Sequence, residues 1–227
     1  MATVAVRPAR MVSRRGAHGH VPAGAAAHRG GMTSNDTSTF GGRLLIGATG
    51  SAAIAMLPMY INTLRTTFTG TVTVLMTHTA ATFLPPHTVG LFADRVVTGA
   101  TPDDWAHENQ ATLAAEHDMM AVLPATANML AATATGAVPN MLTATIAAAD
   151  FPVVFFPVMT GEMWLKPAVQ RNADQLRQDG YHVVDPQWGQ RYDVGLKQLV
   201  KAPMPPAPPQ FVEVVRELMP RCGPGEG

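Results

Sequence analysis

Cysteine is almost absent from this sequence, whose 227 residues include only Cys222. This excludes a disulfide framework and a metal site built from several cysteines, and it favours a reducing, cytoplasmic setting with no bound metal. Charged residues make up only 14% of the chain and the formal net charge is zero. Overall charge therefore gives no attraction to nucleic acid or anionic lipid. The 47% of hydrophobic residues are ample for a core, which excludes a disordered acidic or basic protein.

Acidic residues are missing from the first 31 positions, which carry five arginines. Residues 32–227 therefore hold 11 basic and 16 acidic side chains, a net charge of −5. No apolar segment follows the arginines, which argues against a secretory signal. Two alternatives stay open: a transit-like leader, or a disordered extension ahead of a start near Met32. We expect residues 1–40 to be a disordered extension, 41–220 to form one domain and 221–227 to be a disordered tail.

Two stretches, 44–64 and 119–149, contain no charge and are long enough to span a bilayer. Glycine, proline or asparagine residues interrupt both of them, as turns do between a buried strand and a helix. Because helices cover both faces of a central parallel strand, its residues form a continuous apolar run. The two stretches therefore favour a parallel sheet over a membrane protein.

Short apolar or β-branched runs alternate with helical patterns along the chain. The expected strands are 43–47, 71–76, 119–123, 152–157 and 181–184. The expected helices run from the first turn to about 68, over 105–116, through the Ala/Thr-rich stretch up to 149, over 166–179 and over 211–219. This alternation predicts an α/β fold that is Rossmann-like (flavodoxin-like), a doubly wound parallel sheet with helices on both faces. The pattern fails over 187–209, whose prolines predict a mobile loop.

Polar turns follow three of the expected strands, at the sheet edge where such folds bind ligands. The first, Gly-Ala-Thr-Gly-Ser at 47–51, suits a phosphate because its backbone can be approached closely, although a structural tight turn explains it equally well. The second is Thr-His-Thr at 77–79, and the third is Pro-Ala-Thr-Ala-Asn at 124–128. Asn128 either caps a helix or contacts a ligand, since an unpaired amide is costly to bury.

A fourth segment, 157–164, reads Pro-Val-Met-Thr-Gly-Glu-Met-Trp and follows the expected strand at 152–157. Methionine and tryptophan after a buried strand usually belong to the core. At the carboxyl end of a strand they also suit an aromatic or flavin surface. Both interpretations stay open for Met163 and Trp164.

The runs PATANM (124–129), PVMTGEMW (157–164) and PAVQRN (167–172) resemble the homo-oligomeric flavin-containing cysteine decarboxylases, whose signatures read PASANT and PXMNXXMW. That family comprises phosphopantothenoylcysteine decarboxylases and lantibiotic-type peptidyl-cysteine decarboxylases, with flavin prenyltransferases as more distant relatives. The likeness extends from LLIGATGS (44–51) to about residue 186. The run EHDMMAVLPATAN (116–128) is most similar to the lantibiotic branch.

The resemblance implies FMN, or alternatively FAD, at the strand-end turns, with its phosphate on the first two turns and its ring against 124–128. The cofactor-binding residues expected on this basis are Gly50, Ser51, Thr77, Thr79, Pro124, Ala125, Thr126, Asn128 and Trp164. In this family the site forms between subunits of a trimer, often with four trimers in a dodecamer. Met163 and Trp164 would then serve a neighbouring subunit's flavin.

The implied reaction is oxidative decarboxylation of the C-terminal cysteine of a ribosomally made precursor peptide. Oxidation of the thiol to a thioaldehyde gives an electron sink β to the carboxylate, and loss of carbon dioxide then leaves an enethiol, as aminovinyl-cysteine formation requires. The implied partners are that peptide, further copies of the chain and other peptide-modifying enzymes, with no nucleic acid and no membrane.

Three departures from the family pattern concern the site, and one of them is Met129, where PASANT ends in threonine. The family's active-site histidine lies fourteen residues before the first proline of PASANT, and this position is Gln110 here. His107, one helical turn earlier, is either a substitute or a surface residue. The family's asparagine that contacts the substrate carboxylate is replaced by Thr160, whose hydroxyl has a shorter reach. The catalytic candidates are therefore Gln110, His107, Thr160 and Met163.

Residues 187–209 lack the cysteine that phosphopantothenoylcysteine decarboxylases carry there to return hydrogen to their product. The enethiol would therefore be released, with the reduced flavin reoxidised by an outside acceptor. The expected substrate lid consists of Trp188, Arg191, Tyr192 and Lys197. The alternatives are a phosphopantothenoylcysteine-type small-molecule decarboxylase and a non-catalytic flavin-binding subunit.

Overall fold

The computed structural model describes residues 39–99 and 108–220. The expected tail at 221–227, His107 and the expected extension up to residue 38 lie outside these residues. Phe40, the last residue of the extension, forms a β-bridge with Phe68, and the two ring centroids lie 5.0 Å apart. The Arg216 guanidinium lies 4.5 Å from the Phe40 ring. The domain boundary expected at residue 41 is therefore at least one residue too late.

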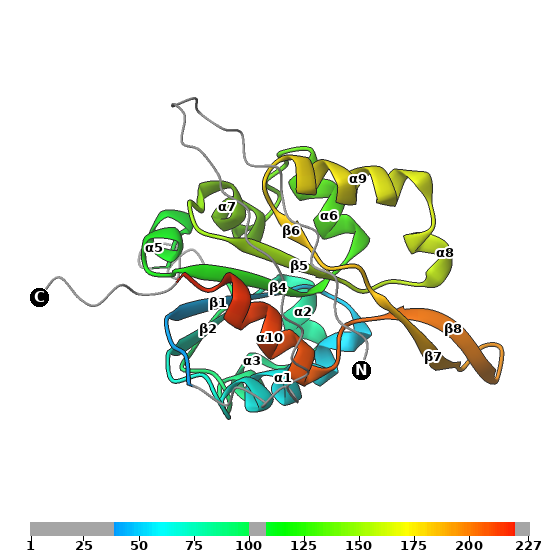
Figure 1. The fold of residues 1–227 in the computed structure, drawn as a ribbon, viewed down its shortest axis with the longest axis horizontal. Helices are drawn as coiled ribbons and strands as arrows, with labels where there is room; N and C mark the ends of the chain where they lie inside the picture. Colours follow the sequence, from blue (N-terminus) through cyan, green and yellow to red (C-terminus); the bar gives the residue numbers. More distant parts are fainter. Residues whose placement is uncertain (1–38, 100–107, 221–227) are drawn as a thin grey trace, which may run out of the picture.

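Six parallel strands form the central sheet, in the order β3-β2-β1-β4-β5-β6 (Figure 1). The order of all six is that of a doubly wound Rossmann sheet, and without the short edge strand β3 it is that of flavodoxin, so the predicted fold class is confirmed. All five expected strands are present, whereas β3 is too short to produce a sequence pattern. The strands are β1 (Arg43–Ala48), β2 (Thr71–Met76), β3 (Arg95–Val97), β4 (Met119–Ala125), β5 (Val153–Pro157) and β6 (His182–Val183).

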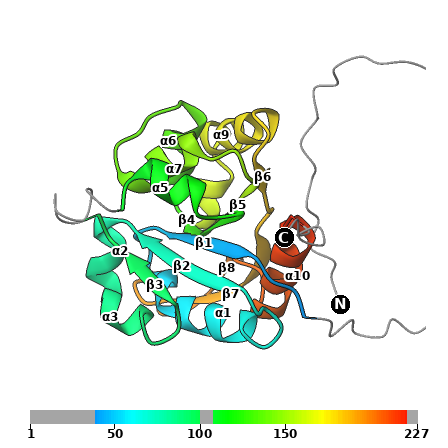
Figure 2. The same ribbon diagram turned by 90° about the vertical axis from the view of Figure 1, so that its left-hand side faces the viewer.

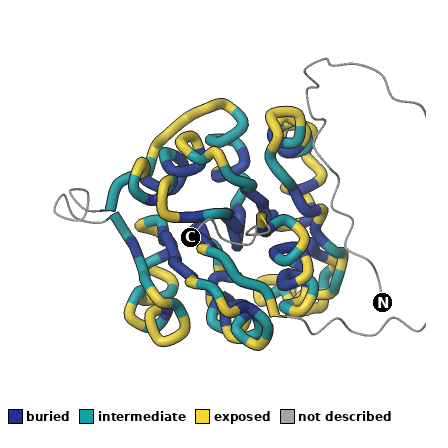
Figure 3. Tube along the Cα trace, turned by 60° about the vertical axis from the view of Figure 1, so that its left-hand side comes forward, coloured by how far each residue is buried: buried dark blue, intermediate teal, exposed yellow. Residues whose placement is uncertain are grey.

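Helices cover both faces of this sheet (Figure 2). Leu44 and Ile46 of β1 belong to the core cluster beneath one helix layer, whereas Leu45 belongs to the cluster beneath the other. This burial from both sides explains the charge-free runs of the sequence, and Figure 3 shows the exposed residues on the outer turns and helix faces. One layer contains η1 (Ala52–Met56), α1 (Leu57–Leu64), α2 (His78–Phe83), α3 (Pro86–Val89) and α10 (Pro208–Leu218). The other contains α5 (Gln110–Ala115), α6 (Ala127–Ala134), α7 (Met141–Ala148), α8 (Gly161–Trp164) and α9 (Pro167–Gln178). Within 39–99 and 108–220, every helix is too short or too polar to be a membrane span.

Residues 187–204 form a β-hairpin that extends from the body of the protein (Figure 1), so the irregular loop expected over 187–209 is wrong. β7 (Gln187–Asp193) pairs antiparallel with β8 (Gln198–Met204) in a separate two-stranded sheet. Pro203 is tolerated because both strands are edge strands, which have a free side. The Tyr60 hydroxyl donates to the Pro206 carbonyl oxygen at 2.6 Å and so fixes the return from the hairpin to α10.

His117 is buried between α5 and β4, with 6% of its surface exposed, and its Nδ1 lies 2.7 Å from the Leu113 carbonyl oxygen. Because burial disfavours the charged imidazole, the pKa of His117 lies below its usual value, and the nearby charge of Arg95 acts in the same direction. Burial also lowers the pKa of His182 in β6.

We predict that the protein loses stability as the pH falls from about 7.5 to about 5.5, and that His117→Gln reduces this loss. An imidazole whose pKa is lowered in the folded state binds its proton more readily after unfolding, so a fall in pH through its unfolded pKa of about 6.5 favours the unfolded chain. Asp94 and Asp118 also have lowered pKa values, but they lose their contribution only below about pH 4. Urea unfolding at the two pH values measures the effect, and an equal loss in both proteins would contradict it.

Candidate functional site

Four helices begin at the carboxyl edge of the sheet, and a hydroxyl side chain caps each of them. The hydroxyl oxygens of Ser51, Thr77, Thr126 and Thr160 follow β1, β2, β4 and β5, and each accepts a hydrogen bond from a backbone N–H of the next helix at 3.3–3.4 Å. Such caps satisfy N–H groups that a helix start leaves unpaired. Because each oxygen accepts from the backbone, its own O–H hydrogen remains for a ligand. One sheet edge therefore presents four hydroxyl donors.

The buried hydroxyl of Thr49 joins two of these turns. Its Oγ1 donates to the Pro124 carbonyl oxygen at 2.6 Å and accepts from the Thr126 backbone N–H at 3.3 Å. Only 3% of Thr49 is exposed. The strand order reverses between β1 and β4, and doubly wound folds bind ligands at this switch point. Thr49 therefore fixes the two sides of the expected ligand crevice relative to each other.

Gly50 brings the second turn against the first. A Cβ added to Gly50 would lie 2.6 Å from Thr79 Cβ, so the absence of a side chain is required by this contact with α2. The Thr77 backbone N–H donates to the Ala48 carbonyl oxygen at 3.0 Å and so joins the turn after β2 to the last residue of β1. Thr77 is half-buried and Thr79 is exposed. The structure thus brings together Gly50, Ser51, Thr77 and Thr79, whose binding of a cofactor stays a prediction.

The third turn begins later than expected, because Pro124 and Ala125 are the last residues of β4 and both are buried. The Ala125 carbonyl oxygen accepts from the Val158 N–H at 2.9 Å and links the ends of β4 and β5. Thr126 makes the helix cap, so the capping alternative for Asn128 is wrong. Asn128 is exposed, so its amide can bond to solvent, and its contact with a ligand stays a prediction. Met129, where the family has threonine, is 2% exposed in the core.

The residues of 157–164 divide between core and surface. Trp164 is 6% exposed and lies in the core cluster beneath α9, because α8 turns residues 161 and 164 inward. This burial favours the core interpretation of Trp164, and its contact with a cofactor stays a prediction. Met163 is 44% exposed and Thr160 is exposed beside it. Thr160, Glu162 and Met163 are therefore the exposed side chains at the start of α8, and the catalytic role of Thr160 and Met163 stays a prediction.

The structure does not bring Gln110 to the strand-end turns of its own chain. Gln110 is the exposed first residue of α5, which Asn109 caps. Figure 1 shows α5 at the end of the sheet where β4 begins, away from α8 and the hairpin. His107 lies outside the described residues, so its position relative to Gln110 stays a prediction.

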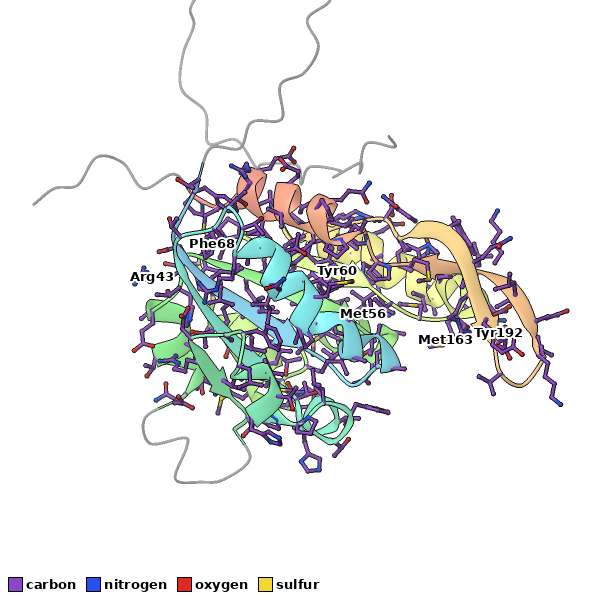
Figure 4. The ribbon with its side chains drawn as sticks, turned by 90° about the horizontal axis from the view of Figure 1, so that it is seen from below. Arg43, Met56, Tyr60, Phe68, Met163 and Tyr192 are labelled. Carbon is purple, nitrogen blue, oxygen red and sulfur yellow. The ribbon has the colours of Figure 1, made fainter. Side chains whose placement is uncertain are left out.

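The expected lid residues do not all lie on one face of the hairpin, because alternate residues of a strand point to opposite faces. Trp188 and Tyr192 share one face of β7, whereas Arg191 points to the other and pairs with Asp193 at 3.6 Å. Lys197 lies in the tip between the strands with a positive φ of 52°. Figure 4 labels Met163 of α8 and Tyr192 of β7.

Sequence reasoning missed Lys201 on β8, whose Nζ lies 5.5 Å from the centroid of the Trp188 ring. Residues 198–204 show no alternation of apolar and polar residues, so the sequence carried no clear signal for the face on which Lys201 lies.

Comparisons with known proteins show which family and which solved structures the chain is similar to. Residues 32–205 match the Flavoprotein family. The mersacidin decarboxylase of Bacillus sp. (strain HIL-Y85/54728) is 35% identical over 144 residues, which cover 63% of this chain and 73% of that protein. The epidermin biosynthesis protein EpiD from Staphylococcus aureus has a similar structure, with a TM-score of 0.68 at 25% identity over 75% of this chain and 98% of that chain. The FMN-dependent cysteine decarboxylase SpaF gives a TM-score of 0.63 at 32% identity, over 78% of this chain and 94% of that chain.

We predict that Thr49→Val lowers the free energy of unfolding by about 2 kcal/mol, because it leaves the buried Pro124 carbonyl and Thr126 N–H without their shared partner. Thr49→Ser keeps the hydroxyl and should lose less. Thr145→Val is the matched control, since the buried Thr145 hydroxyl bonds only within its own helix, to the Met141 carbonyl oxygen at 2.8 Å. Urea unfolding followed by circular dichroism compares the variants, and a Thr49→Val protein no less stable than Thr145→Val would contradict the prediction.

Proposed function

Because this chain belongs to the Flavoprotein family, we propose that it uses a bound flavin to decarboxylate the C-terminal cysteine of a precursor peptide oxidatively. The observation that carries the proposal is the set of four capping hydroxyls at one sheet edge, around the switch point that Thr49 bridges. The likeness to mersacidin decarboxylase supports the reaction. FMN is the proposed flavin because SpaF is FMN-dependent, with FAD as the alternative.

The residues of the first two turns fit the phosphate of a flavin. Ser51 and Thr77 are half-buried, and each keeps an O–H hydrogen to donate to a phosphate oxygen. Gly50 has no side chain, so a phosphate could approach its backbone closely, and Thr79 is exposed beside it. The ring would lie against Thr126 and Asn128, above the buried end of β4 formed by Pro124 and Ala125.

A bound flavin supplies the two-electron oxidation of the cysteine thiol. The chain's own residues would position the thiol, hold the carboxylate and exclude water. The exposed Thr160 hydroxyl accepts from the Met163 N–H at 3.4 Å and can donate to the carboxylate, while the Met163 side chain would contact the substrate. Because 187–209 contain no cysteine, no thiol there returns hydrogen to the product, which would leave as an enethiol.

A second copy of the chain would complete the site. Gln110 lies away from the turns of its own chain, so it would serve the flavin of a neighbouring subunit. Large apolar side chains are exposed on the layer that contains α1 and α2, and contact between copies would bury them: Met56, Met59, Phe83 and Leu91. A trimer, with four trimers in a dodecamer, is the proposed assembly.

A non-catalytic flavin-binding subunit is the second candidate, favoured by Gln110 and Thr160 where the family has histidine and asparagine. The phosphopantothenoylcysteine-type activity is disfavoured by the absence of cysteine from the hairpin.

We predict that the purified protein binds FMN or FAD and removes about 46 Da, carbon dioxide and two hydrogens, from peptides that end in cysteine. Mass spectrometry measures the loss, and flavin absorbance measures the cofactor. Peptides that end in serine are the control, because they offer no thiol. Flavin binding without mass loss would favour the non-catalytic subunit, and a colourless protein that takes up neither flavin would exclude both candidates.

We predict that Thr160→Ala lowers kcat/KM for such peptides about tenfold while the flavin stays bound, since one hydrogen bond to the carboxylate is lost. Thr160→Asn is the matched variant, because asparagine also caps helices and adds an amide donor. It should retain or exceed the activity of the unaltered protein. Normal turnover by Thr160→Ala would show that this hydroxyl does not contact the substrate.

A further inference from the structure

One face of the hairpin faces α8. The cross-strand pairs Trp188–Pro203, Gln190–Lys201 and Tyr192–Leu199 share a face, because alternate residues of a strand point the same way. A Cβ added to Gly161 of α8 would lie 3.1 Å from Trp188 Cζ3. The face that carries Trp188 therefore lies against the first turn of α8.

Lys201 is placed at the same contact. Its carbonyl oxygen would lie 3.7 Å from the Gly161 Cβ, and Thr160, the cap of α8, directly precedes Gly161. The Lys201 Nζ lies 5.5 Å from the centroid of the Trp188 ring, within the range of a cation–π interaction. The ammonium is thus held beside the ring that covers Gly161, close to the carboxyl end of β5.

The electrostatics of the two hairpin faces differ. Arg191 and Asp193 lie on the opposite face, where they form an ion pair. Among the three cross-strand pairs on the α8 face, Lys201 is the charged residue. It forms no ion pair with a carboxylate of the described residues, and this includes Glu162 of α8. The α8 face therefore combines exposed apolar side chains with one positive charge that has no acidic partner in the described part of the chain.

We propose that the Lys201 ammonium binds the C-terminal carboxylate of the peptide substrate, which rests on the proposed function. A peptide that ends between the hairpin and α8 would place its carboxylate beside Thr160 and its preceding side chains against Trp188, Tyr192 and Leu199. The carboxylate is the one part of such a terminus that needs a charged partner. Lys201 and Thr160 would share it, the first as a cation and the second as a hydroxyl donor.

The chemistry predicts how Lys201 affects the kinetics. The substrate carboxylate loses its negative charge as carbon dioxide leaves, so a cation that pairs with it stabilises the bound substrate at least as much as the transition state. Lys201 should therefore contribute to KM and not to kcat. Because the side chain is exposed and screened by solvent, the contribution should be modest, about fivefold.

The test uses the flavin-loaded oligomer and two non-reactive probes, peptides that end in serine with a free carboxylate or with a carboxamide. The unaltered protein should bind the carboxylate probe about fivefold more tightly. Lys201→Met should remove this preference and leave the affinity for the carboxamide probe unchanged. It should also raise KM for cysteine peptides with kcat unchanged. Lys201→Arg should keep the preference. Lys166→Met, which removes an exposed lysine outside the hairpin, is the matched control and should keep it as well.

A Lys201→Met protein that still prefers the carboxylate probe would overturn the inference, as would an equal loss of affinity for both probes, which would indicate a disturbed hairpin. Either result leaves the proposed function intact if cysteine peptides still lose mass. Failure of the unaltered protein to decarboxylate cysteine peptides would instead count against the proposed function.

Discussion

Burial of the sheet on both faces is the constraint on which the functional site depends. With helices packed above and below β1, β4 and β5, polar groups can meet a ligand only where the strands end. The carboxyl ends of β1, β2, β4 and β5 each lead into a helix capped by serine or threonine. The hydroxyl of Thr49 then joins the turns after β1 and β4. The side chains that stabilise these turns are therefore also the ones proposed to bind the cofactor.

The hairpin is stabilised in a different way, because it lies outside this core. An isolated pair of strands is marginally stable in water, so β7 and β8 depend on contacts at their base. Tyr60 bonds the Pro206 carbonyl, Gln187 donates to Gln210 at 2.9 Å, and Trp188 covers Gly161. In the distal part the side chains of Tyr192, Val194, Leu196 and Leu199 are exposed, and among residues 39–99 and 108–220 nothing supports them in this way. A firm base and an unsupported tip suit an element that closes over a substrate.

The sequence predicted what local patterns determine. Buried strands are continuous apolar runs and strand-end turns carry glycine and hydroxyl residues, so β1, β2, β4, β5 and the turn residues were found. Features that depend on packing between distant segments were missed. Pro124 and Ala125 extend β4, and Phe40 is held by Phe68 and Arg216. The core position of Trp164 was one of two interpretations that the sequence left open. In 187–209 the prolines concealed the hairpin, and with it the face on which Lys201 lies.

The character of the site also follows from its donors. The described turns after β1, β2, β4 and β5 offer hydroxyls, an amide and backbone N–H groups but no lysine or arginine. Hydrogen-bond donors can hold a phosphate without placing a full positive charge beside a reacting carboxylate. A strong cation there would bind the substrate carboxylate and oppose the loss of its charge. The positive charge nearest to α8 in the hairpin is instead an exposed lysine that solvent screens. A weakly held carboxylate, positioned by hydroxyls, is what a reaction that expels carbon dioxide requires.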